Sequence, residues 1–123
     1  GLKGLIARCD ANANAVADFV AKKPFLEFLA KDPTTRSNTS VCLNFVDPSL
    51  ADLSEKDQTA FAKSVAALLE KEGVGFDLGS YRDAPPGLRI WCGATVEARD
   101  VAALMPWIEW AFIEAKASLA KAA

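Results

Sequence analysis

The stretch GLRIWCGATVEARDVAALMPWIEWAF, residues 87–112, changes its hydrophobic period part of the way along. Leu88, Ile90 and Cys92 recur at every second position, which is the period of a strand with one buried face. After Asp100 the apolar residues recur three and four positions apart, which is the period of a helix packed on one side. This stretch therefore predicts a strand followed directly by a long amphipathic helix, with Asp100 as the N-cap of that helix.

The same two periods recur earlier in the chain. A helical stripe covers Gly1–Lys22, and Pro24 ends it. A second helix is predicted to begin after the N-cap Ser54 and to end at Gly73. Asp57, three residues after Ser54, is at the position of the acidic partner in a capping box. Short apolar or alternating segments predict strands at 25–30, 41–46, 74–78 and 88–95, and polar, Gly- and Pro-containing segments predict a turn at 31–38 and a loop at 79–87.

The predicted order is helix, two strands, helix, two strands, helix. Strands that arrive in adjacent pairs favour antiparallel pairing, whereas strands that alternate singly with helices favour a parallel sheet. We therefore expect an α+β two-layer sandwich in which helices cover a mainly antiparallel sheet. The 123 residues fit one domain, 1–123, with a single core.

Composition and charge exclude several classes of partner. The chain is 51% hydrophobic and 24% charged, with a net charge of −2, as in ordinary globular domains. The five arginines are scattered, whereas binding to nucleic acid or to an anionic membrane needs clustered basic residues in excess. No apolar run approaches the roughly eighteen residues of a membrane-spanning helix. We expect no nucleic-acid partner and no membrane partner.

The three cysteines and the absence of histidine limit the chemistry. Cys9, Cys42 and Cys92 are far apart and form no C-x-x-C pair, so a zinc site is not expected. A nucleophilic cysteine usually has a histidine as its base, and this chain has none. We interpret the three as buried, reduced thiols of a cytoplasmic protein. The sequence also lacks the P-loop, G-x-G-x-x-G and G-x-S-x-G motifs, so no catalytic residue is assigned.

Arg89 is the residue that departs most from its local pattern. If Leu88 and Ile90 face the core, alternation turns Arg89 toward the other side of the sheet. An arginine held on a strand can present its guanidinium bidentately to a carboxylate or a phosphate. The alternative is a structural ion pair with Asp83 or Glu97, and spacing alone slightly favours that alternative.

Other polar and aromatic positions carry weaker signals. Arg82 lies in the Gly79–Gly87 loop, where plain exposure to solvent is the simpler interpretation. The turn Arg36–Asn38 has groups that could bind an anion, although Ser and Asn in turns mostly bind their own backbone. Trp107 and Trp110 are three apart on the last predicted helix, where packing or contacts between domains are simpler roles than a ligand platform.

Three runs resemble a known family. They are TRSNTSVCLNFVDP (Thr35–Pro48), YRDAPPGLRIWCGATVE (Tyr81–Glu97) and RDVAALMPWIEWAF (Arg99–Phe112). All three closely resemble the C-terminal part of phosphoserine aminotransferases, and GLRIW is the most specific portion. The opening run, Gly1–Val20, resembles the long helix that leads from the large domain of those enzymes into their small domain.

The resemblance implies a fold, a reaction and partners. Members are fold type I enzymes that use pyridoxal phosphate to transfer an amino group from glutamate to 3-phosphohydroxypyruvate, on the route to serine. They are cytoplasmic homodimers whose active site lies where domains and subunits meet. The lysine that binds the cofactor, the aspartate on its pyridine nitrogen and the phosphate cup all belong to the large domain. None of the lysines here sits in a matching motif, so no cofactor-binding residue and no metal ligand is assigned in this chain.

The resemblance also implies roles for two arginines. Arg89 matches the small-domain arginine that holds the α-carboxylate of the substrate, and Arg82 matches a basic group near its phosphate. Members often carry a histidine beside the latter, where this chain has Tyr81. The chain is then a substrate-clamping C-terminal small domain, with residues 1–22 leading in from a large domain, and is inactive alone.

A second hypothesis is a stand-alone α+β module that binds a ligand or a protein without catalysis. The two hypotheses differ in one observable feature. A domain that packs against further protein should expose an apolar face, above all on the first helix, whereas a stand-alone module should present a polar surface there.

Overall fold

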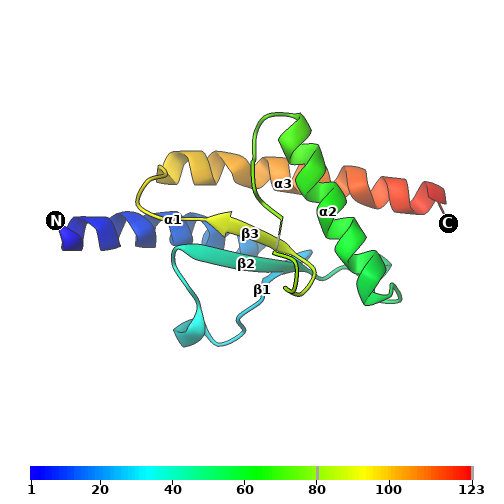
Figure 1. Ribbon diagram of the computed structural model, residues 1–123, viewed down its shortest axis with the longest axis horizontal. Coiled ribbons are helices and arrows are strands. Elements are labelled where there is room, and N and C mark those ends of the chain that lie inside the picture. Colours follow the sequence, from blue (N-terminus) through cyan, green and yellow to red (C-terminus); the bar gives the residue numbers. More distant parts are fainter. Residues whose placement is uncertain (80, 123) are drawn as a thin grey trace.

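A computed structural model describes residues 1–79 and 81–122; Ser80, which falls in the predicted loop, and Ala123 lie outside the described residues. Helices and strands follow one another in an alternating pattern of one helix and then one or two strands (Figure 1). The elements are α1 (Leu2–Lys22), β1 (Leu26–Phe28), η1 (Pro33–Thr35), β2 (Ser40–Phe45), η2 (Pro48–Leu50), α2 (Glu55–Lys71), β3 (Leu88–Trp91) and α3 (Ala98–Ala122).

The strands form one antiparallel sheet in the order β1-β2-β3. Its two faces differ. The covered face presents Val41 and Leu43 of β2 and Leu88 and Ile90 of β3, all of which are buried against the helices. In Figure 1, α1 and α3 run alongside the sheet and α2 crosses α3. The expected α+β fold with an antiparallel sheet is confirmed.

The opposite face of the sheet carries the alternate residues. We call it the open face, defined by Glu27, Ser40, Cys42, Asn44, Arg89 and Trp91. Cys42 lies opposite Arg89 and Ser40 lies opposite Trp91 across the β2–β3 pair. Each of these side chains is at least partly exposed. Adjacent residues of one strand therefore meet different surroundings, as the two-residue period requires.

Three predictions about the positions of elements are wrong. The strand predicted at 88–95 ends at Trp91, because the chain then turns, with the Val96 amide donating to the Gly93 carbonyl at 3.1 Å. The segment 74–78 is not a strand, because Asp77 adopts a φ of 55° that breaks the extended backbone. This part of the chain is joined to β3 by the bridge between Gly79 and Leu88 and by a hydrogen bond from the Arg89 amide to the Leu78 carbonyl. Asp100 is not the N-cap of α3 either. The helix already begins at Ala98, so Asp100 lies in its first turn, where its charge still complements the helix dipole.

The predicted start of α2 is confirmed. Ser54 has extended backbone geometry, and its hydroxyl oxygen accepts a hydrogen bond from the amide of Asp57 at 3.1 Å. This contact satisfies one of the amides that a helix leaves without a partner in its first turn. The local sequence therefore sets where α2 begins, and tertiary packing decides where its apolar stripe points.

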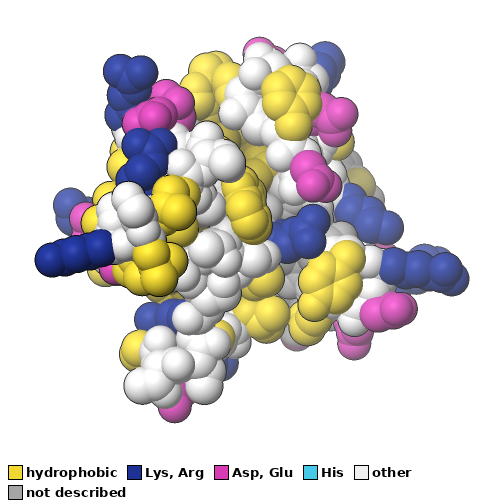
Figure 2. Space-filling model, turned by 60° about the vertical axis from the view of Figure 1, so that its left-hand side comes forward, with side chains coloured by type: hydrophobic (Ala, Val, Ile, Leu, Met, Phe, Trp, Pro, Cys, Tyr) yellow, Lys and Arg dark blue, Asp and Glu magenta, His cyan; other side chains and the backbone are white. Residues whose placement is uncertain are grey.

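The surface mixes side chains of different kinds. On the face shown in Figure 2, basic and acidic groups are interspersed with hydrophobic ones, and neither sign of charge dominates. The start of α1 is different, because Leu2, Leu5 and Ile6 are 73%, 52% and 49% exposed. These residues are three and four positions apart and so lie on one side of the helix. They form the apolar stripe that the first hypothesis expects on the first helix.

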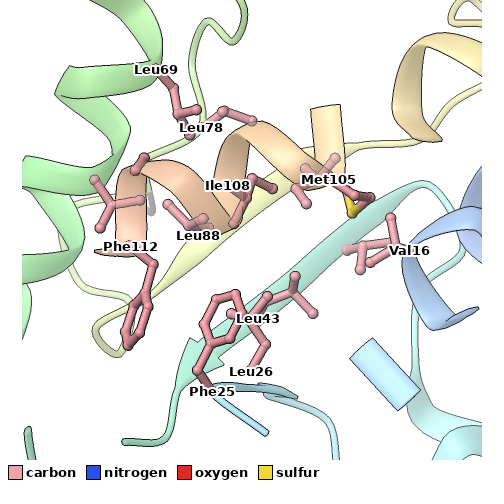
Figure 3. Close-up of a cluster of buried hydrophobic side chains, with 14 of the residues drawn as sticks. Val16, Phe25, Leu26, Leu43, Leu69, Leu78, Leu88, Met105, Ile108 and Phe112 are labelled. Carbon is pink, nitrogen blue, oxygen red and sulfur yellow. The ribbon is translucent and has the colours of Figure 1, made fainter. Parts of the chain in front are cut away.

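The core lies between the helices and the covered face. Ile108 and Phe112 of α3 project toward the strands that carry Leu43 and Leu88 (Figure 3). Phe112 is the centre of an aromatic group. Its ring stacks on Phe25 at 4.4 Å between centroids and lies 5.7 Å from the rings of both Phe45 and Phe61. Such aromatic pairs add to the stability that burial alone provides.

A buried asparagine ties α1 to the end of β3. The Asn12 side chain is 1% exposed, and its amide nitrogen lies 3.0–3.1 Å from the carbonyl oxygens of Cys92, Gly93 and Val96. These carbonyls belong to the turn between β3 and α3, which lies outside the hydrogen-bonded strands of the sheet. Because buried carbonyls need donors, Asn12 replaces the hydrogen bonds that the sheet no longer supplies.

Candidate functional site

Arg89 projects from the open face at the middle of β3. Its neighbours Leu88 and Ile90 are 1% and 2% exposed, whereas the Arg89 side chain is 32% exposed. The alternation of the strand therefore turns this guanidinium away from the core, as the sequence predicts. A charge in this position is partly desolvated yet still reachable, which strengthens its attraction for a carboxylate or phosphate.

The ion pair of Arg89 is made with an acid that the sequence analysis did not consider. The guanidinium nitrogen NH2 lies 3.6 Å from the Asp77 carboxylate oxygen Oδ2. Glu97, one of the two predicted partners, instead binds Arg8 at 2.9 Å, and this contact holds the pKa of Glu97 below its usual value. The other predicted partner, Asp83, is exposed on the loop. The expectation of Asp83 or Glu97 is therefore wrong.

The loop before β3 closes over the open face beside Arg89. The Tyr81 ring lies 5.8 Å from the centre of the guanidinium, within the range of a cation–π contact. Pro85 and Pro86 line a cavity of about 20 Å³ together with Arg89. Gly87 approaches β2 so closely that a Cβ there would lie 2.1 Å from the Leu43 carbonyl oxygen, so only glycine fits.

Arg82 occupies the same loop, next to Tyr81, and its side chain is exposed. Because Tyr81 contacts Arg89, the backbone of Arg82 is brought to the same end of the site. The cavity of about 20 Å³ is far below the roughly 300 Å³ at which ligand pockets usually begin. The hollow beside Arg89 is therefore too small to enclose a ligand by itself.

The rest of the open face is polar and partly ordered by side-chain contacts. The Asn44 amide donates to Glu27 at 2.8 Å and, with Lys31, holds the pKa of Glu27 below its usual value. The Trp91 indole donates to the Thr95 hydroxyl at 3.1 Å. The ring lies over Gly93, where a Cβ would lie 2.3 Å from it. The tryptophan beside the site is therefore held in one orientation, although it is 57% exposed.

The two weaker candidates have internal roles. Arg36 donates to the Ala30 carbonyl at 2.8 Å and lies over the Phe28 ring at 4.0 Å. Ser37 in turn accepts hydrogen bonds from backbone amides of its own turn. Trp107 and Trp110 meet edge to face at 5.6 Å, and Trp110 packs against the core. These contacts fit structural roles for both groups.

The cysteines only partly match the prediction of three buried thiols. Cys92 is fully buried, and burial together with the nearby Cys9 thiol raises its pKa from 9.0 to about 11. Cys9 and Cys42 are half-buried, so for them the prediction of full burial is wrong. For Cys42 the reason is its position on the open face, where no helix of the described chain covers it.

The lysines of the described chain do not fit the binding of pyridoxal phosphate. A lysine that forms a Schiff base needs a buried, electrostatically perturbed amine. All lysines here are exposed except Lys23, which is half-buried and pairs with Glu109 at 2.6 Å. Within residues 1–79 and 81–122, no three acidic or cysteine side chains gather as metal ligands do. In the same residues, no helix combines the length and hydropathy required to cross a bilayer.

Sequence reasoning missed Asp77 and Asn12. Asp77 was hidden because the segment 74–78 reads as a strand, in which an acid would simply face solvent. Its only signal is the pair of glycines, Gly75 and Gly79, that flank it and indicate irregular backbone. Asn12 was detectable as a polar residue inside the apolar stripe of Gly1–Lys22, where a buried partner must satisfy it.

Together these features define a small α+β domain with a partly exposed arginine on the open face of its sheet. No protein-family model matches the chain. Phosphoserine aminotransferase from Methanosarcina mazei is 48% identical to it over 112 residues, and the enzyme of that name from Methanosarcina barkeri is 49% identical over 112 residues. The resemblance is thereby confirmed: this chain is homologous to part of the phosphoserine aminotransferases.

The extent of the match is uneven. It covers 91% of this chain but only 28% of each Methanosarcina protein. The relatives therefore contain a much larger portion with no counterpart in these 123 residues.

Proposed function

We propose that this chain is the C-terminal small domain of a phosphoserine aminotransferase and that Arg89 binds the α-carboxylate of the amino-acid substrate. The parent enzyme transfers an amino group between glutamate and 3-phosphohydroxypyruvate in serine biosynthesis. It works in the cytoplasm as a homodimer. The observation that carries this proposal is the partly exposed guanidinium on the open face, in a chain homologous to enzymes of that name.

The division of labour follows from what the chain contains. Pyridoxal phosphate, when bound by the large domain, supplies the chemistry of amino-group transfer. The small domain supplies orientation, because Arg89 fixes one end of the substrate by charge-assisted hydrogen bonds. Arg82, on the loop that closes beside Arg89, contacts the phosphate end of the substrate. By itself this domain binds substrate weakly and is inactive.

The exposed stripe Leu2, Leu5 and Ile6 favours this proposal over a stand-alone module. Apolar side chains that are half or more exposed along one side of a helix are covered by further protein in the intact enzyme. We propose that this cover comes from the large domain of the same protein. A self-sufficient module would instead carry polar residues along that side of α1.

The test is the Arg89→Ala variant of the full-length enzyme. Loss of the guanidinium removes a charge-assisted pair and leaves the substrate charge without a partner. Transition-state stabilisation should fall by about 3–4 kcal/mol, so kcat/KM for glutamate should fall on the order of a hundredfold to a thousandfold. Arg99→Ala is the matched control, because Arg99 is 86% exposed at the start of α3 and away from the open face. Unchanged kcat/KM for glutamate in Arg89→Ala would reject the assignment.

Arg82→Ala separates the two ends of the substrate within the same experiment. This variant should raise KM for 3-phosphohydroxypyruvate and leave KM for glutamate near its original value, because only the first substrate carries a phosphate. Equal effects on both substrates would show that Arg82 does not act through the phosphate.

A further inference from the structure

In this structure the Asp77 carboxylate forms an ion pair with the guanidinium of Arg89, which is the group that we propose binds the substrate carboxylate. Its Oδ2 atom lies 3.6 Å from NH2 of Arg89, whose guanidinium also lies 5.8 Å from the centre of the Tyr81 ring. We propose that Asp77 pairs with Arg89 in the empty site and competes there with the incoming carboxylate. This inference rests on the proposed function of Arg89 and assigns the control of its affinity to a second residue.

The backbone fixes Asp77 in this place. Its φ of 55° lies in the left-handed region, which aspartate and asparagine tolerate better than most residues. The next residue, Leu78, accepts a hydrogen bond from the Arg89 amide at 2.9 Å, and Gly79 pairs with Leu88. The backbone that follows Asp77 is therefore bonded directly to the strand that carries Arg89, which keeps Asp77 within reach of the guanidinium.

The pair is arranged so that a ligand can displace it. A charge-assisted hydrogen bond usually measures about 2.7–2.9 Å, so a separation of 3.6 Å is loose. Asp77 is 90% exposed, and exposed ion pairs contribute little. A substrate carboxylate that binds the guanidinium bidentately in a closed cleft makes the stronger contact. The pair between Asp77 and Arg89 is therefore weak enough for an incoming carboxylate to displace it.

Two nearby acids do not share this position. Glu97 is engaged by Arg8 at 2.9 Å. Asp83 is exposed on the loop two residues after Tyr81, and its ion-pair distance to Arg89 exceeds 4.0 Å, since Asp77 is the acid within that limit among the described residues. The competition is therefore assigned to Asp77 alone, and Asp83 provides a matched control of the same charge.

Kinetics of the full-length enzyme with glutamate test the inference. Asp77→Asn removes the charge and retains a side chain suited to the left-handed backbone, so the fold is preserved. We expect KM for glutamate to fall by about two- to fivefold with kcat unchanged, as the weakness of exposed ion pairs dictates. This difference in KM between Asp77→Asn and the original enzyme should be smaller at high salt, because salt screens the pair between Asp77 and Arg89. Asp83→Asn should leave KM unchanged.

The outcomes separate the two proposals. If Asp77→Asn leaves KM for glutamate unchanged or raises it, competition by Asp77 is rejected, while a large loss in Arg89→Ala still supports the carboxylate clamp. If Arg89→Ala has no effect, both proposals fail. In the Arg89→Ala background, Asp77→Asn should have no effect on KM. If Asp77→Asn still lowers KM for glutamate in that background, Asp77 acts through its general negative charge and not through Arg89, which overturns the inference.

Discussion

The two faces of the same three-stranded sheet have different roles. On the covered face, Leu88 and Ile90 are almost completely buried among side chains of the helices. On the open face, Arg89 is one-third exposed and Trp91 more than half exposed. These four residues are consecutive in β3, so one short strand belongs at the same time to the core and to a candidate site.

The difference teaches how a small domain can offer a rigid binding group. The covered face stabilises the strand through apolar burial, at roughly 25 cal/mol for each Å² removed from water. The open face contributes little to stability, so its residues are available for binding. Because the backbone of β3 is fixed by its buried half, the guanidinium on the other half is positioned without a dedicated scaffold.

The strongest test of this comparison uses two adjacent residues of β3. Ile90→Ala should lower the free energy of unfolding by about 2–5 kcal/mol, because it leaves a cavity in the core. Arg89→Ala should change it by less than about 1 kcal/mol, because the pair with Asp77 is exposed. Chemical denaturation of the two variants measures both values. Similar losses would show that the two faces are not energetically distinct.

The second test concerns the end of the same strand. Asn12→Ala leaves the buried carbonyls of Cys92 and Gly93 without their donor, which should cost about 1–3 kcal/mol of stability. Asn14→Ala is the control, since Asn14 lies two residues away on α1 and is exposed. If both variants unfold at the same denaturant concentration, Asn12 does not stabilise the turn that follows β3.

The sequence predicts most of this fold because hydrophobic period is a local signal. The alternation of Leu88 and Ile90 located β3 and turned Arg89 outward. Ser54 located the start of α2 through its own side chain. The segment 74–78 was assigned wrongly because its apolar residues resemble a strand, whereas the φ of Asp77 is set by contacts with β3 that sequence period does not report.

The site was less predictable than the fold. Arg89 could be singled out because a charge between buried residues is unusual, and the resemblance gave it a role. Its partner could not, since Asp77 and Arg89 meet only after the chain returns along β3. Spacing favoured Asp83 and Glu97, which are closer in sequence. Side-chain pairing across a fold depends on tertiary geometry that neither spacing nor composition contains.

The smallest expected effect contrasts two cysteines on the two faces. Cys92 continues the inward alternation of β3 and is fully buried, and burial raises its pKa to about 11 from 9.0. Below pH 9 this thiol is protonated in both the folded and the unfolded chain, so its full contribution to stability is present. As the pH rises from 9 toward 11, the thiol ionises in the unfolded chain but not in the folded one, and the free energy of unfolding falls. At pH 10 the loss should be on the order of 1 kcal/mol.

Unfolding measured at pH 8 and at pH 10 checks this sign. The original chain should lose more stability between the two values than Cys92→Ala, which has no thiol to ionise in the unfolded state. Cys42→Ala is the matched control for the removal of a thiol, because Cys42 lies on the open face and is only half-buried. Equal pH dependence in the original chain and in Cys92→Ala would mean that the thiol at position 92 ionises as readily in the folded chain as in the unfolded one. The covered face would then not exclude charge at the end of β3, and the separation between the two faces would stop at Ile90.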